Sequence, residues 1–376
     1  YQAGLEQMEQ ALALDPNYAL GYADRGLMYS SLGDNSRAMA DWQKALALDP
    51  TLAKVHHNIG LIYYKNKDYE SAIKEYDTAL AIDPGRASTW STRADIMLSL
   101  ADYSTCIENA GQAITLYPES WPSYYLRGSC RANLGQFAEA IPDLDIYIKA
   151  RPDNAQGWYN RGLSHRYLGN NEQALSDYTQ AIQLDPQFAW ALINRGNVYL
   201  DLKKPDLALA DYNTALDLGE IPRAYIGRGD AYLALKRYDE AEIAYQQAIQ
   251  MFPNDDYSYS KLAGLYLAQQ KYQETIEAAN QALQFTTTMQ DKGFALQRRG
   301  RAYYGLGQYE LAIEDQNWII QNTPTQADFY YRGLTSQALG RNAEATGDFE
   351  LFLSQGGAGD EEKIKDAEAR LATLRQ

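Results

Sequence analysis

The feature that most constrains this chain is a period of about 34 residues, in which one helical pattern returns from Ala19 to Gly359. Each unit has about thirteen residues with helical apolar spacing, a short break rich in Gly, Asp or Asn, a second helical stretch and often Asp-Pro. Such units bury their apolar faces on their neighbours, so the period predicts a solenoid rather than a globule. Ten full repeats begin at Ala19, Ala53, Ala87, Trp121, Ala155, Ala189, Pro222, Asp256, Gly293 and Gln326.

Small residues occupy the eighth and twentieth positions of nearly every repeat, and a large ring often occupies the twenty-fourth. Because small side chains let two helices approach closely, we expect the eighth and twentieth positions to face each other inside a helical hairpin, with the ring filling the space beside them. The eighth positions are Gly26, Gly60, Ala94, Gly128, Gly162, Gly196, Gly229, Ala263, Gly300 and Gly333. The rings at the twenty-fourth position are Trp42, Tyr76, Tyr178, Tyr212 and Tyr245.

A second pattern joins arginine at the seventh position to aspartate sixteen residues later. The six matched pairs are Arg25–Asp41, Arg127–Asp143, Arg161–Asp177, Arg195–Asp211, Arg299–Asp315 and Arg332–Asp348. We expect each guanidinium to cross from the first helix to the second helix of its own repeat and to be partly buried there. The alternative is an anion-binding row of arginines, which the matched carboxylates would neutralise.

These residues resemble the tetratricopeptide repeat family, and the resemblance covers essentially the whole chain. It implies an all-α solenoid of antiparallel helix pairs that form a right-handed superhelix, with a concave groove lined by the first helix of each pair. It also implies a binding module rather than a reaction. Some family members hold a chaperone's C-terminal carboxylate with a lysine at the fifth position, but no fifth position of this chain is lysine, so that partner is disfavoured.

We predict one continuous array in three parts. Residues 1–18 align with the second helix of a truncated first repeat, residues 19–359 form the ten repeats, and residues 360–376 form a capping helix with one apolar stripe. Because a second helix without its first helix would leave apolar surface open, we expect the natural polypeptide to extend further toward its N-terminus.

The net charge and the absence of known motifs limit the classes of partner and activity to be expected. The net charge of −15 repels phosphate backbones and anionic membranes, so nucleic acid is not an expected partner. No apolar stretch approaches the roughly 20 residues of a membrane span, so we expect no membrane insertion. No metal-binding, phosphate-binding or nucleophile motif occurs, and we therefore expect no catalytic residue, no metal and no cofactor in this segment.

The few cysteines and histidines are interpreted as packing residues. Cys106 and Cys130 fall at core positions of neighbouring repeats and are interpreted as two small buried apolar residues, with a disulfide as the alternative. His56, His57 and His165 are interpreted as core or groove side chains rather than as metal ligands or catalysts.

Helical spacing turns the second, fifth, sixth, ninth and thirteenth positions of each first helix toward the groove. In the repeats that begin at Trp121, Ala155 and Ala189, these positions carry rings and amides, which suit the side chains and the extended backbone of a peptide. The alternative is that single rings pack between repeats, since the chain has 31 tyrosines. The predicted partner-binding residues, including the adjacent Arg166, are Tyr125, Asn133, Tyr159, Asn160, Arg166, Tyr167, Trp190, Asn194 and Asn197.

The leading hypothesis is a non-catalytic scaffold that binds a protein or peptide partner in the groove. The alternative is the substrate-recruiting or regulatory arm of a larger multidomain enzyme whose catalytic part lies outside this segment. A third reading is self-assembly through exposed repeat ends, so the oligomeric state stays open. The pattern names neither the partner nor the compartment.

Overall fold

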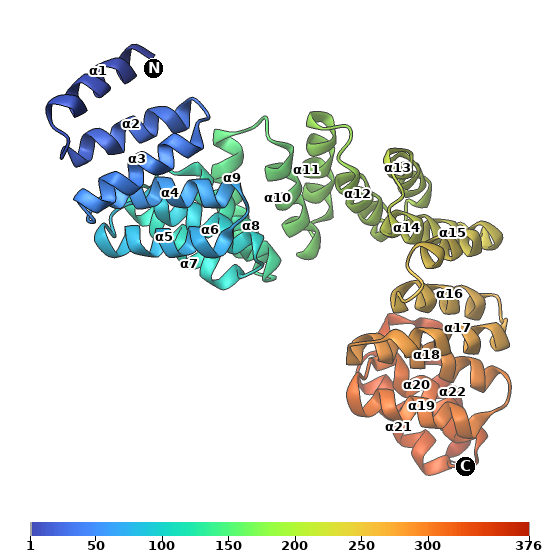
Figure 1. The fold of residues 1–376 in the computed structure, drawn as a ribbon. Helices are drawn as coiled ribbons and strands as arrows, with labels where there is room; N and C mark the ends of the chain where they lie inside the picture. Colours follow the sequence, from blue (N-terminus) through green and yellow to red (C-terminus); the bar gives the residue numbers. More distant parts are fainter. Residues whose placement is uncertain (1, 376) are drawn as a thin grey trace. The chain divides into compact units, whose positions relative to one another are not determined.

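The computed structural model describes residues 2–375, which form 22 α-helices and one short 3-10 helix (Figure 1). The first helices of the repeats are α2 (Ala19–Ser31), α4 (Ala53–Lys65), α6 (Ala87–Ser99), α8 (Trp121–Asn133), α10 (Ala155–Tyr167), α12 (Ala189–Asp201), α14 (Pro222–Ala234), α16 (Asp256–Ala268), α18 (Met289–Gly305) and α20 (Gln326–Ala338). The second helices are α3 (Asn35–Leu48), α5 (Tyr69–Ile82), α7 (Tyr103–Leu116), α9 (Phe137–Ala150), α11 (Asn171–Leu184), α13 (Pro205–Leu218), α15 (Tyr238–Met251), α17 (Tyr272–Phe285), α19 (Tyr309–Asn322) and α21 (Asn342–Ser354). Before them comes α1 (Gln2–Leu14), and after them come η1 (Gly357–Gly359) and α22 (Glu361–Leu374). The predicted bounds at Tyr1 and Gln376 lie outside the described residues.

The helices form the predicted all-α architecture, in which each first helix packs against the second helix of its own repeat (Figure 1). Most first helices begin at the residue that the period marks as a repeat start, but α18 begins at Met289, four residues before Gly293. Thr288 caps this longer helix, because its hydroxyl accepts a hydrogen bond of 3.1 Å from the backbone N–H of Asp291. Part of the connection before Gly293 is therefore helical.

The chain divides into two compact units, one ending at Pro186 and the other beginning at Gln187. Unit 1 holds α1 to α11, and unit 2 holds α12 to α22. The sequence predicted one continuous array, and the period runs through this boundary unchanged. Each unit is described below by itself.

The hairpin contact explains why the eighth position is small. A Cβ added to Gly60 of α4 would lie 2.5 Å from the ring of Tyr76 on α5, and the ring of Tyr76 is fully buried. A Cβ added to Gly26 would lie 2.5 Å from the ring of Trp42 and 3.1 Å from the carbonyl oxygen of Ala38, the residue at the twentieth position. The twenty-fourth side chain therefore occupies the space in which an eighth side chain would begin.

All six predicted arginine–aspartate pairs are present as bidentate ion pairs. In the pair between Arg161 and Asp177, the two N···O distances are 2.9 and 2.6 Å, the guanidinium side chain is 20% exposed and the aspartate side chain is 3% exposed. The hypothesis of a partly buried pair within each repeat is confirmed. An anion-binding row of arginines is correspondingly disfavoured, because each of these guanidinium groups already has its carboxylate.

Several seventh-position arginines also donate to the preceding repeat, and two of them donate to an aspartate there, which the sixteen-residue pattern did not predict. Arg161 donates a further bond of 2.6 Å to Asp145. Arg93, which has Asn109 rather than an aspartate sixteen residues later, donates to Asp77 at 2.9 Å. These bonds link one hairpin to the next, so the same side-chain position ties the array together both within and between repeats.

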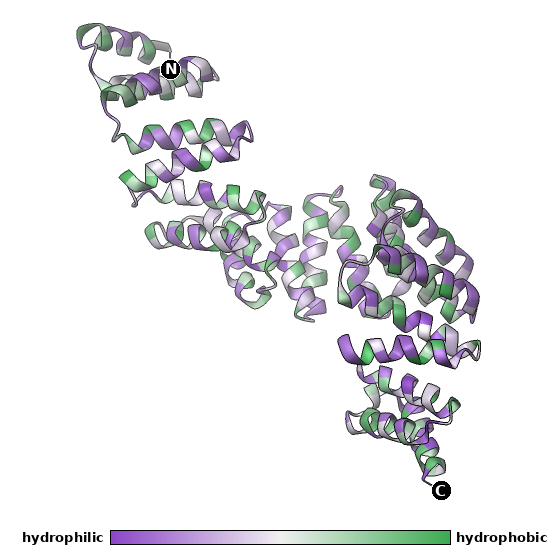
Figure 2. Cartoon of the chain, turned by 60° about the horizontal axis from the view of Figure 1, so that its bottom comes forward, coloured by the Kyte–Doolittle hydropathy of each residue, from purple (hydrophilic) through white to green (hydrophobic). Residues whose placement is uncertain are grey.

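Hydrophobic and hydrophilic residues are interleaved along the helices of both units (Figure 2), as expected for helices with one buried face. On α22, the predicted stripe of Ile364, Ala367, Leu371 and Leu374 packs against buried residues of α20 and α21. Within residues 2–375, no helix is both long enough and apolar enough to cross a membrane.

Candidate functional site

Neighbouring first helices contact each other directly within each unit, for example α6 with α8 and α16 with α18. Their second, fifth, sixth and ninth positions therefore share one face, which we call the first-helix face. Each unit has a cavity on this face, and the two cavities differ in size and chemistry.

The cavity in unit 1 has a volume of about 630 Å³ and lies between α6 and α8. From α6 it is lined by Ser88, Ser91, Thr92 and Asp95, which occupy the second, fifth, sixth and ninth positions of their repeat. Its volume falls within the range of pockets that bind small ligands or side chains of a partner. We call it the aromatic cavity, because rings make up its opposite wall.

Four rings line the aromatic cavity, namely Tyr117, Trp121, Tyr125 and Tyr147. The ring centroids of Tyr125 and Tyr147 lie 4.7 Å apart, and those of Trp121 and Tyr147 lie 5.9 Å apart. Burial raises the pKa of the Tyr125 phenol, and the nearby charge of Asp95 adds to the rise. Burial also raises the pKa of the Tyr147 phenol, so both phenols are neutral at physiological pH.

Two carboxylates complete the lining. The hydroxyl of Tyr64 donates a hydrogen bond to one oxygen of Asp95, and Glu119 is exposed at the start of the connection into α8. No lysine, arginine or histidine lines the cavity. Among the described residues, neither carboxylate has a cationic side chain within ion-pair distance.

Tyr147 reaches the cavity because of two substitutions that fit each other. It stands at the twenty-seventh position, where most repeats have alanine, for example Ala113 and Ala181. Its ring is 6% exposed, and a Cβ added to Gly157 of α10 would lie only 2.8 Å from it. A glycine in the next repeat thus makes room for a ring that would otherwise overfill the interface.

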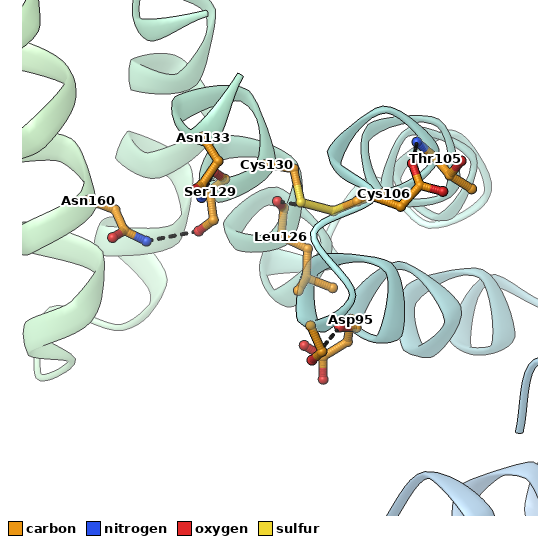
Figure 3. Close-up of a disulfide and its surroundings, with 10 residues drawn as sticks. Asp95, Thr105, Cys106, Leu126, Ser129, Cys130, Asn133 and Asn160 are labelled. Atoms are coloured by element: carbon orange, nitrogen blue, oxygen red, sulfur yellow. Dashed lines mark hydrogen bonds between the residues drawn. A yellow bond between two sulfur atoms is a disulfide. The ribbon is translucent and has the colours of Figure 1, made fainter. Parts of the chain in front are cut away.

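A disulfide joins Cys106 of α7 to Cys130 of α8 (Figure 3), which corrects the interpretation of these cysteines as two separate apolar residues. Both are fully buried as expected, and their Cα atoms lie 6.4 Å apart, within reach of a disulfide. The pattern could not place them together because they belong to different repeats, and only the packing of α7 on α8 brings them close. Leu126, which lines the cavity one turn before Cys130, lies on the helix that the disulfide fixes.

The structure places the predicted residues of unit 1 in different environments. Tyr125 lines the aromatic cavity. Asn160 is buried, and its amide donates to Ser129 Oγ at 2.9 Å across the α8–α10 contact (Figure 3). Asn133 is exposed, and its amide donates to the carbonyl of Ser129 at 2.8 Å. The ring of Tyr159 lies 5.9 Å from that of Tyr178 and is half-buried.

Two other predicted residues of unit 1 lie at the end of α10. Tyr167 is 61% exposed and stacks on Phe137 with ring centroids 4.6 Å apart, while the guanidinium of Arg166 lies 5.8 Å from the Tyr167 ring. These two side chains do not line the aromatic cavity. Tyr167 combines a fixed orientation with an open ring face, which is the property expected of a surface anchor.

The remaining predicted residues belong to α12 in unit 2. Trp190 is 48% exposed, whereas Asn194 is buried and its amide donates to the backbone carbonyl of Trp190 at 3.0 Å. Asn197 accepts a hydrogen bond of 2.8 Å from the hydroxyl of Tyr212. In this helix, two of the three predicted residues therefore hydrogen-bond within their own repeat.

The cavity in unit 2 has a volume of about 220 Å³ and lies between α16 and α18. We call it the mixed-charge cavity, because it is lined by Lys261 and Arg298 and also by Asp256 and Asp291. Arg298 donates to Ser260 Oγ at 3.0 Å and to the carbonyl of Phe294 at 2.7 Å. Burial lowers the pKa of Arg298, and the like charge of Arg301 adds to this effect.

Sequence reasoning missed most of the aromatic cavity. Ser88, Ser91 and Asp95 stand at the positions that were assigned to the groove, but their small or common side chains gave no reason to select them. Tyr147 could have been selected from the sequence, because a ring replaces the alanine that most repeats have at the twenty-seventh position. Within the part of the chain that the structure describes, no group of three or more His, Cys, Asp or Glu side chains is arranged to hold a metal ion.

Comparison with known proteins identifies the repeat. Models described as tetratricopeptide repeat match residues 53–86, 92–155, 155–188, 193–256 and 226–289, and a model described as TPR repeat matches residues 26–67. No curated protein matches the chain.

Many solved structures are similar to this chain, and three of them are described here. The first is the APC/C hetero-tetramer Cut9–Hcn1, with 16% identity, a TM-score of 0.59, and coverage of 100% of this chain and 93% of that one. The second is PilW, described as a widely conserved type IV pilus biogenesis factor, with 19% identity, a TM-score of 0.49, and coverage of 54% and 94%. The third is YrrB, described as a TPR protein with an unusual peptide-binding site, with 24% identity, a TM-score of 0.46, and coverage of 50% and 97%.

At 16% identity, the match to Cut9–Hcn1 supports the fold alone. The family models match residues along most of the chain, from 26 to 289, and the same helical pairs continue to the end of α21. The chain belongs to the tetratricopeptide repeat family, a family of protein-interaction scaffolds.

Proposed function

We propose that this protein is a non-catalytic scaffold that binds an extended peptide segment of a partner protein on the first-helix face of unit 1. The observation that carries the proposal is the aromatic cavity between α6 and α8, which has a volume of about 630 Å³. Binding surfaces draw most of their energy from a few rings that sit in partly desolvated pockets.

The position of the cavity favours a peptide over a small metabolite. The repeat positions that line it on α6 also occur on α8 and α10, so a bound peptide can continue past the cavity onto the next first helix. Asn133 and Tyr167 are exposed on α8 and α10 and offer an amide and a ring along that direction. We include them as further contacts of the peptide in unit 1, and Trp190 as a separate candidate contact in unit 2.

The test is a selection of peptides from a random display library against the full chain, followed by calorimetric titration of the best binders. Tyr125→Ala and Trp121→Ala should each weaken binding by about tenfold or more, because each removes a ring from the cavity wall. Ile243→Ala is the matched control, since this side chain is 56% exposed on the second helix α15. The proposal fails if the selected peptides bind the Tyr125 and Trp121 variants as tightly as they bind the unaltered chain, with all variants folded by circular dichroism.

A further inference from the structure

The aromatic cavity has an unusual charge environment for this protein. Most buried or half-buried carboxylates on the helices have cationic partners, as in the six arginine–aspartate pairs. The half-buried Asp95 of α6 is an exception, and the exposed Glu119 lies beside it in the cavity lining. Neither forms an ion pair among the described residues. Two uncompensated negative charges therefore face the same space.

The rings of the cavity, like its two carboxylates, favour a cationic ligand. The face of an aromatic ring attracts a cation through its quadrupole, and tryptophan does so most strongly. Trp121 already illustrates this preference, since the guanidinium of Arg151 lies 5.4 Å from the centre of its ring. Arg151 does not supply the missing charge to the cavity, because it pairs with Asp153 at 3.0 Å and does not line the cavity wall.

The remaining lining groups are small hydroxyls and aliphatic side chains. Ser88, Ser91 and Thr92 can accept hydrogen bonds from an ammonium or guanidinium group, while Leu126 and Pro122 can contact a methylene stem. The two carboxylates would repel an anionic side chain, and an uncharged one would leave them without a cationic partner.

We propose that the aromatic cavity binds the lysine or arginine side chain of a basic peptide segment, with Asp95 and Glu119 as its counter-charges. This inference rests on the proposed function of the first-helix face, and it adds the chemical class of the partner. The net charge of −15 agrees with it, because a negatively charged surface speeds the encounter with a basic partner.

The test uses fluorescein-labelled nine-residue peptide pools that are random except at the central residue, which is fixed as lysine, arginine, norleucine, glutamine or glutamate. Binding to the full chain is measured by fluorescence anisotropy at low and at moderate salt. The lysine and arginine pools should bind about tenfold more tightly than the norleucine pool, which keeps the aliphatic stem without the charge. The difference should shrink as salt is added, since one partner is at the surface.

Variants of the two carboxylates locate the effect. Asp95→Asn keeps an acceptor for the Tyr64 hydroxyl and removes only the charge, and Glu119→Gln does the same at the second carboxylate. Each should lower the preference for the basic pools by several-fold, and the double variant should abolish it. Glu172→Gln is the control, because this exposed glutamate of α11 does not line the cavity.

The outcomes separate the two proposals. Peptide binding that depends on Tyr125 but is equal for the lysine and norleucine pools would overturn the charge inference and leave the scaffold proposal standing. A preference for basic pools that survives in the double variant would also overturn it, by placing the effect elsewhere. Failure of every pool to bind would contradict both proposals.

Discussion

The aromatic cavity of unit 1 and the mixed-charge cavity of unit 2 occupy equivalent places in the repeat but offer different chemistry. Both lie between consecutive first helices and are lined at the second, fifth and sixth positions. The cavity of unit 1 is lined by rings and by carboxylates that have no ion-pair partner. The cavity of unit 2 is lined by Lys261 and Arg298 together with Asp256 and Asp291.

The comparison separates two kinds of position within one period. The eighth and twentieth positions are constrained by contact inside the hairpin, so they stay small from repeat to repeat, and a large side chain usually fills the twenty-fourth position beside them. The groove positions lie outside the contact within the hairpin, so their side chains vary more from repeat to repeat. The two units should therefore respond alike to changes in the hairpin and differently to changes in cross-links or titrating groups.

The largest expected effect concerns the arginine–aspartate pair inside the hairpin, which both units share. Asp177→Ala in unit 1 and Asp315→Ala in unit 2 each remove the buried carboxylate that pairs with a half-buried guanidinium of the same repeat, and each should cost about 3 kcal/mol in the free energy of opening. Hydrogen exchange of the amides in α10–α11 and in α18–α19 measures this opening locally. A loss below about 1 kcal/mol in either unit would show that the ion pair is not equivalent in the two.

The disulfide should distinguish the units, because both cysteines of the chain lie in unit 1. Replacing Cys106 and Cys130 together with alanine removes a cross-link between residues 24 apart in sequence and should cost about 3 kcal/mol in the opening of α7 and α8. Reduction of the unaltered chain should give the same local loss, and exchange in unit 2 should not change. Identical exchange before and after reduction would mean that the cross-link adds no stability.

Mild acid should also affect only unit 1 through histidine, since all three histidines are in that unit. Burial lowers the pKa of His57 to about 4, helped by the charge of Arg86, and Thr89 Oγ1 lies 2.9 Å from its Nδ1. The unfolded chain takes up a proton near pH 6.5, so the stability due to neutral His57 is complete above that pH and is lost as the pH falls toward 4. Between pH 7 and pH 5 the loss should be about 2 kcal/mol.

His57→Gln isolates this effect, because it removes the titrating group while the carboxylates remain. The unaltered chain should show the pH-dependent loss in the amides of α4 and α5, and the variant should show little change over the same range. An equal pH dependence in both proteins would assign the effect to other groups.

The smallest expected effect concerns the link between repeats. Asp145→Ala removes the second partner of Arg161, but the side chain of Asp145 is 53% exposed. The loss should be about 0–1 kcal/mol, far below that of Asp177→Ala, because solvent screens an exposed pair. If the same exchange experiment gave equal losses for the two variants, the Arg161–Asp145 bond between repeats would contribute as much stability as the Arg161–Asp177 bond within one repeat.

The hairpin could be predicted closely from the sequence because its contacts are local. Gly60 and Tyr76 stand sixteen residues apart, and so do Arg161 and Asp177, so the spacing alone brings each pair face to face across one turn. The extension of α18 to Met289 was missed, since it depends on the cap at Thr288 in a connection that departs from the period.

The candidate site was less predictable. Helical spacing correctly assigned the groove positions that line the cavity, and Tyr125 is one of the lining residues. Asn160 and Asn194 share the same register but are buried: Asn160 hydrogen-bonds to Ser129 of the adjacent α8, and Asn194 hydrogen-bonds to the backbone of its own helix. The importance of Tyr147 depended on Gly157 in the next repeat, a pairing that no single repeat displays.

The sequence by itself determined the repeat, the helical hairpin and the ion pair inside it, because these depend on side chains within one turn-connected unit. Only the tertiary structure decided which repeats open a cavity, where the disulfide forms and where the chain divides into two units. Those features depend on how closely one hairpin packs on the next, and that distance is set by many side chains at once rather than by any one spacing in the chain.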